Sequence, residues 1–123
     1  IYTAQLNAKS PKFCRNTCCS CSSPSYYYEQ IRVIPSKTAT YTFSANGTLS
    51  AYGYLYQYPF SASQSCSNIL VQDNDPFNQW KFNITAQLSA STTYILVVTS
   101  YRSGETGPFS VFASGAANIT LTK

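Results

Sequence analysis

Apolar and polar residues alternate along most of this chain, and no stretch follows the helical period of about 3.6 residues. The clearest case is the segment QWKFNITAQL at residues 79–88. One face holds Trp80, Phe82, Ile84, Ala86 and Leu88, and the other holds Lys81, Asn83, Thr85 and Gln87. A period of two residues predicts a β-strand with one face toward a core.

Similar segments recur along the whole chain, at residues 1–6, 26–34, 38–45, 51–58, 68–71, 92–101, 108–114 and 118–123. Turn-forming residues separate many of them, as at Asn46-Gly47, Asp73 to Pro76, Ser103-Gly104 and Ser114-Gly115. About eight or nine short strands in one chain predict an all-β fold, an antiparallel β-sandwich or jelly roll.

The first 25 residues differ from the rest of the chain. They begin with a strand-like segment made of Ile1, Tyr2, Thr3, Ala4, Gln5 and Leu6. A run rich in Cys, Pro and Ser follows, which includes CRNTCCSC at residues 14–21. We therefore expect two parts, an N-terminal strand with a Cys-rich arm at 1–25 and a β-sandwich domain at 26–123.

The five cysteines are Cys14, Cys18, Cys19, Cys21 and Cys66. An odd number leaves one sulfur without a partner inside the chain, either as a free thiol or for a bond to a second molecule. We expect one disulfide between the cluster and Cys66 and one within the cluster. The alternative is a zinc site, but zinc usually takes paired C-x2-C motifs, and the chain has no His to assist.

Three N-x-[ST] sequons, at Asn46, Asn83 and Asn118, predict N-linked glycans. Strand alternation places Asn83 and Asn118 on outward faces, and Asn46 lies in an Asn-Gly turn. Only 10% of the residues are charged, whereas typical soluble domains have about 25%. Together these features indicate an extracellular protein, secreted or at the cell surface, in which disulfides form.

The region from Tyr26 onward resembles the pre-peptidase C-terminal (PPC-like) domain family. The resemblance rests on YTFSANGTLSAYGYLYQYPF at 41–60, on SNILVQDNDPFNQWKFNITAQLSASTTYILVVTSY at 67–101 and on TGPFSVFASG at 106–115. These pieces keep the family's order of strands and its acidic loop. The resemblance implies a jelly-roll sandwich without catalytic activity, used as an extracellular module.

The chain departs from the family pattern at two places. Ser50-Ala51 stands where members often carry Asp, and the acidic loop is reduced to Asp73-Asn74-Asp75-Pro76. Similar loops hold calcium through several oxygen ligands, so Asp73 and Asp75 are candidate calcium ligands. The alternative is a polar turn in which these side chains bond to the backbone.

The residue inventory argues against an enzyme. The acids are Glu29, Asp73, Asp75 and Glu105, there is no His for acid–base work, and no G-x-S-x-G or phosphate-binding loop is present. The net charge of +4 forms no dense basic patch, so we expect no nucleic-acid partner. The longest apolar run, YILVV at 94–98, is too short to cross a bilayer, so we expect no membrane insertion.

Two binding surfaces are therefore the candidates for function. Tyr52, Tyr54, Tyr56 and Tyr58 share one strand face and form either a glycan-stacking or interface surface, or part of the core. The segment Ile1–Leu6 could add as a strand to an exposed sheet edge. Pairing within its own chain gives a monomer, whereas pairing with the next copy gives an open filament.

Our leading hypothesis is a structural subunit of an extracellular fibril or matrix, which assembles with itself through this strand and an interchain disulfide. The alternative is a monomeric carbohydrate-binding module, with calcium at Asp73 and Asp75. A third option is one repeat of a longer adhesive protein.

Overall fold

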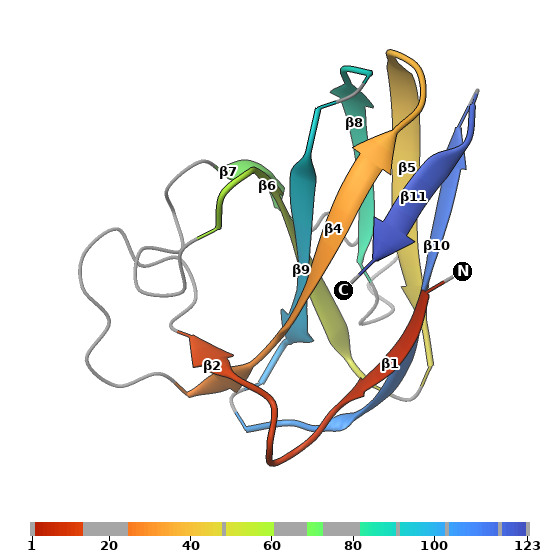
Figure 1. The fold of residues 1–123 in the computed structure, drawn as a ribbon. Coiled ribbons are helices and arrows are strands. Elements are labelled where there is room, and N and C mark those ends of the chain that lie inside the picture. The colour runs from red at the N-terminus through yellow and green to blue at the C-terminus, as the bar shows by residue number, and fades with distance from the viewer. Residues whose placement is uncertain are drawn as a thin grey trace.

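All regular structure in the described part of the chain is β-strand. The computed structural model describes residues 2–13, 25–47, 49–60, 69–72, 82–90, 92–102, 104–115 and 117–122. The strands are β1 (Tyr2–Leu6), β2 (Lys12–Phe13), β3 (Tyr26–Tyr27), β4 (Glu29–Pro35), β5 (Ala39–Asn46), β6 (Ala51–Gln57), β7 (Ile69–Gln72), β8 (Asn83–Leu88), β9 (Tyr94–Ser100), β10 (Gly107–Gly115) and β11 (Ile119–Thr122) (Figure 1). The expected all-β class is confirmed. The strand expected at 26–34 is divided into β3 and β4, and β2 is a short strand that alternation did not predict.

Two main sheets contain most of the strands, and every pairing in them is antiparallel. The first sheet has the order β1-β10-β5-β8, and the second has the order β11-β4-β9-β6-β7. A small ribbon pairs β2 with β3. Because neighbours in each sheet are seldom neighbours in sequence, the chain repeatedly crosses from one sheet to the other (Figure 1).

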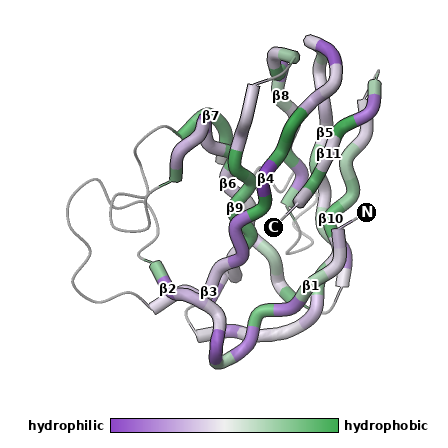
Figure 2. The backbone as a smooth tube through the Cα atoms, in the orientation of Figure 1, coloured by the Kyte–Doolittle hydropathy of each residue, from purple (hydrophilic) through white to green (hydrophobic). Residues whose placement is uncertain are grey.

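Both main sheets contribute side chains to one hydrophobic core. Tyr41, Phe43 and Ile84 come from the first sheet, while Val33 and Leu96 come from the second, and all five are fully buried. Figure 2 shows the alternation along β4, where hydrophobic and hydrophilic residues follow one another. The inward positions expected from the sequence in β5 and β8 are confirmed for the described residues.

A second core covers the other face of the second sheet. It contains Phe13, Tyr54, Tyr56, Ile95 and Val97, each at most 1% exposed. Strand β9 is consequently buried at every position. Because both faces of β9 are covered, the strand contains a continuous apolar run and does not alternate between apolar and polar residues.

Candidate functional site

The N-terminal strand is paired within its own chain. Strand β1 runs antiparallel to β10, with Tyr2 opposite Val111 and Leu6 opposite Gly107 (Figure 1). It forms one edge of the first sheet. The sequence alone did not decide whether this segment pairs with its own chain or with another copy. In the structure of the single chain, it pairs with its own chain. Residue Ile1 lies outside the described part of the chain.

The inward face of β1 fills the end of the main core. Leu6 is 1% exposed, and the half-buried Tyr2 and Ala4 pack against the same core. Thr3 and Gln5 point outward and are exposed. Burying one leucine side chain contributes about 1.5–3 kcal/mol, so Leu6 is the main apolar anchor of the strand.

A polar contact joins β1 to the opposite sheet. The Tyr2 hydroxyl donates a hydrogen bond to Oε2 of Glu29, the first residue of β4. Glu29 is only 8% exposed, although it is an acid. Burial, and to a smaller extent the hydrogen bond to Glu29, raise the pKa of the Tyr2 hydroxyl above its ordinary value. On the outer face, the hydroxyls of Thr3 and Ser110 are hydrogen-bonded, 3.2 Å apart.

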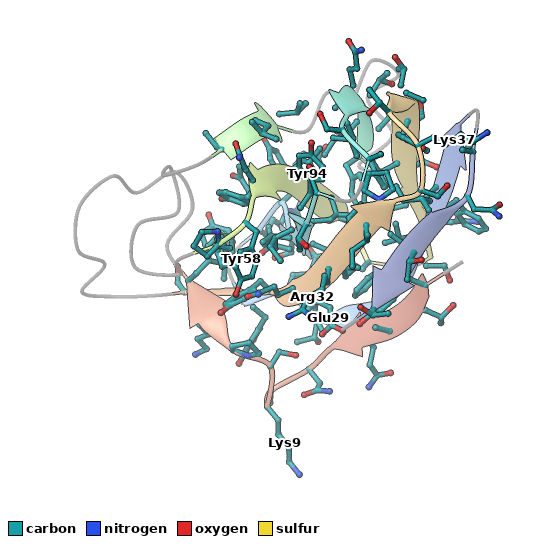
Figure 3. The ribbon with its side chains drawn as sticks, turned by 45° about the horizontal axis from the view of Figure 1, so that its top comes forward. Lys9, Glu29, Arg32, Lys37, Tyr58 and Tyr94 are labelled. Carbon is teal, nitrogen blue, oxygen red and sulfur yellow. The ribbon has the colours of Figure 1, made fainter. Side chains whose placement is uncertain are left out.

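A compact turn follows β1. The Lys9 amide donates to Oδ1 of Asn7 at 2.8 Å, and the Asn7 amide donates to Oγ of Ser10 at 3.0 Å. This is the local side-chain-to-backbone bonding that favours Asn and Ser in turns. Figure 3 shows the Lys9 side chain projecting from the tip of this turn, away from the sheets. The Pro11 carbonyl then accepts from the Tyr28 amide at 3.0 Å, which returns the chain to the domain.

A polar hollow lies between this turn and the start of β4. Its volume is about 450 Å³, and its lining comprises Gln5, Asn7, Lys9, Ser10, Pro11, Tyr28, Glu29 and Gln30. The side-chain amides, the carboxylate and the tyrosine ring offer both hydrogen-bond donors and acceptors beside an aromatic surface. The hollow is therefore suited to a small polar ligand.

The arm has a second anchor at β2. Phe13 is fully buried and meets the rings of Tyr28, Phe60 and Tyr54 edge-on, with centroids 5.0, 5.9 and 6.3 Å away. The Lys12 ammonium lies 5.0 Å from the centroid of the Tyr27 ring. Residues 2–13 thus contact the domain at both cores, at β1 and at Phe13.

The structure divides the tyrosine row of β6. Tyr54 and Tyr56 are fully buried in the second core, Tyr52 is half-buried, and Tyr58 is 52% exposed. On the opposite face Ala51, Gly53 and Leu55 are buried as well. Both faces of β6 are covered, so Tyr54 and Tyr56 belong to the core, the alternative that the sequence left open. An open row of four rings for stacking a glycan is not formed.

The three sequon asparagines lie at the ends of strands. Asn46 ends β5 and is exposed, with its Oδ1 accepting from the Gly47 amide at 2.8 Å. Asn83 begins β8 and is half-buried, whereas strand alternation placed it in solvent. Asn118 is exposed and directly precedes β11. Strands β8 and β11 are edge strands of different sheets.

Several predicted site residues lie outside the described part of the chain. They are Cys14, Cys18, Cys19, Cys21, Cys66, Asp73 and Asp75. The disulfide pattern and the calcium site therefore stay predictions. Among the described residues, no group of three His, Cys, Asp or Glu side chains is placed to hold a metal ion.

Sequence reasoning missed the polar contact of Glu29, the buried position of Phe13 and the hollow. A signal for Glu29 was present, because it lies in phase with Ile31 and Val33 on the inward face of β4. An acid at an inward position needs a hydrogen-bond partner. Phe13 carried no such signal, since its strand has only two residues.

The described residues form no helix that is long and apolar enough to cross a membrane. In comparisons with known proteins, no family model and no curated protein matches this chain.

Proposed function

We propose that this chain is a secreted, N-glycosylated, non-catalytic subunit of an extracellular fibril or matrix, built on a PPC-like β-sandwich of jelly-roll type. Its copies join by exchanging the N-terminal strand, and an interchain disulfide from the odd cysteine strengthens the joint. Two antiparallel sheets around one core support the sandwich. A chain without His and with four acids supports a structural role.

The observation that carries the proposal is the position of β1. It is an edge strand, paired on one side with β10, and only the turn after Leu6 separates it from β2. A second copy offers an identical strand to the same edge. Because exchange makes the same contacts between chains as within one chain, its cost in contact energy is small. One-way exchange from copy to copy does not close, and it produces a filament.

The sequons support the choice of this edge. Asn83 begins the edge strand β8, and Asn118 precedes the edge strand β11, so each sheet has a glycan site at one edge. A glycan is bulky and hinders another chain from pairing there, as natural proteins require at sheet edges. Strand β1 contains no sequon. Association is thereby left open at the β1 edge of the first sheet and at the β7 edge of the second.

Negative-stain electron microscopy of the secreted full-length glycoprotein tests the proposal. We expect filaments for the natural sequence and for Gln5→Asn, which changes an exposed residue of β1. We expect none for Leu6→Asn, which places an amide in the buried leucine site. Uniform single particles for the natural sequence would refute the fibril, and filaments of Leu6→Asn would refute the role of β1.

The hollow favours a second candidate function, a carbohydrate-binding module. Amide side chains beside a carboxylate and a tyrosine ring are suited to sugar hydroxyls and to the apolar face of a sugar ring. Calcium at Asp73 and Asp75 would belong to this alternative. A glycan array probed with the full chain tests it, with Gln30→Ala in the lining and Arg32→Ala outside it. Binding that only Gln30→Ala abolishes supports the module, and an array without hits removes it.

A further inference from the structure

Glu29 is an acid in a position that demands a specific partner. It is 8% exposed, and it shares the inward face of β4 with Ile31 and Val33. A buried carboxylate is unfavourable unless hydrogen bonds replace its lost water. Among the described residues, the hydrogen bond to its side chain comes from the Tyr2 hydroxyl. The hydroxyl that satisfies it therefore belongs to the strand that we propose to be exchanged.

The hydrogen bond forms in one register of β1 only. With Tyr2 opposite Val111, the hydroxyl reaches Glu29. A shift by one residue turns Tyr2 to the outer face, because side chains alternate along a strand. A shift by two residues toward the N-terminus brings Ala4 to the place of Tyr2, and alanine has no donor. Either shift takes the tyrosine hydroxyl away from the carboxylate, which then has only the hollow beside it.

We infer that Tyr2 and Glu29 form a register lock, in which the buried carboxylate accepts only an N-terminal strand that presents a tyrosine hydroxyl at the position of Tyr2. Leu6 supplies apolar anchoring to any strand with a leucine at that position, whereas Glu29 supplies the discrimination. This is the usual division of roles between apolar contacts and a buried polar group that an incorrect partner leaves unpaired.

In the assembled form, Tyr2 of the donor copy would reach Glu29 of the acceptor copy. This extension rests on the proposed strand exchange, while the lock itself is a property of the single chain. The turn after β1 carries no part of the lock, because its hydrogen bonds are local to residues 7–10.

Hydrogen–deuterium exchange of the full-length monomer tests the lock separately from assembly. We compare the natural chain with Tyr2→Phe, Glu29→Met and the double variant, reading the amides of β1 and β10. Tyr2→Phe leaves the carboxylate unpaired, so we expect these amides to exchange at least tenfold faster. The double variant removes the charge together with the hydroxyl, so its exchange returns to within about threefold of the natural rate. The amides of β9 report global unfolding.

Thr3→Val is the matched control, because it removes a hydroxyl and its hydrogen bond to Ser110 from the exposed face of the same strand, where water replaces the lost bond. We expect exchange within about twofold of the natural chain for this variant. If the increases in exchange rate caused by Tyr2→Phe and by Glu29→Met simply multiply in the double variant, the lock is overturned. An increase for Tyr2→Phe no larger than that for Thr3→Val would overturn it as well. Either result would leave the filament test unaffected.

Discussion

At the residue scale, three tyrosines connect burial with a measurable pH dependence. Burial raises the pKa values of Tyr2, Tyr28 and Tyr56 above the ordinary value, and for Tyr2 the bond to Glu29 adds to the effect. A raised pKa means that folding favours the neutral phenol. The resulting stability is fully present below the unfolded-state value of 10.0 and is lost as the pH rises through the folded-state values.

We therefore expect that these three tyrosines make no pH-dependent contribution to the free energy of unfolding below pH 10. Above pH 10 their contribution falls as the pH rises. Each such tyrosine contributes up to about 1.4 kcal/mol per pH unit in that range. Above pH 10, Tyr56→Phe should make the free energy of unfolding fall less steeply with pH, by the equivalent of about one proton released per molecule on unfolding. Urea unfolding between neutral and alkaline pH measures it. An unchanged slope in the variant would show that Tyr56 ionises equally in both states.

Glycine at position 53 is required by a close approach between the sheets. A Cβ added there would lie 2.8 Å from Cγ of Phe82, closer than real Cβ atoms come. We expect Gly53→Ala to lower the free energy of unfolding by about 1–3 kcal/mol, as overpacking does. Phe82→Leu should recover part of this loss when it is combined with Gly53→Ala. The double variant should therefore lose less free energy of unfolding than the two single variants added together. Additive losses in urea unfolding would argue against the clash.

At the element scale, Leu6 is the fully buried apolar residue that anchors β1 to the core. We expect Leu6→Ala to destabilise the protein by about 2–5 kcal/mol, the usual range for a buried leucine. Lys9 and Lys12 are already exposed, but release of β1 should free the backbone around them, so limited trypsin digestion should remove the N-terminal residues faster. Thr3→Ala changes an exposed position and should digest like the natural chain. Equal digestion of Leu6→Ala would mean that β1 does not depend on its anchor.

Alternation predicted most strands to within a few residues, including β1, β5 and β8. It did so because a strand with one covered face must repeat with period two. It did not decide the tyrosine row of β6, because tyrosine is suited to a core and to a surface alike. It also could not identify what covers the outer face of the second sheet. That cover includes Phe13, which is remote in sequence from β6 and contacts Tyr54 only after folding.

The candidate site was predictable in part. The segment 1–6 was expected to act as an added strand, and it lies on a sheet edge. Its partner Glu29 lies 27 residues away in the other sheet, and no local pattern links two such positions. The pairing of β1 with β10 spans almost the whole chain, which alternation alone does not specify.

At the scale of the whole molecule, the odd number of cysteines makes a prediction about covalent assembly. One thiol of Cys14, Cys18, Cys19, Cys21 and Cys66 should form a disulfide between chains. We expect disulfide-linked oligomers on a denaturing gel without reductant and a single monomer band with it. A monomer band under both conditions would contradict the interchain disulfide, although exchange of β1 could still join the copies.

The most direct test of strand exchange is a covalent record of which chain supplies β1. Thr3 and Ser110 lie opposite each other in β1 and β10, so Thr3→Cys with Ser110→Cys places two thiols across the joint. Isotopically labelled and unlabelled chains of this variant are mixed, assembled and oxidised, and the linked peptides containing positions 3 and 110 are weighed by mass spectrometry. Strand exchange predicts hybrid pairs with one labelled and one unlabelled peptide. Linked pairs of a single isotope composition would show that every β1 stays in its own chain and would contradict the account.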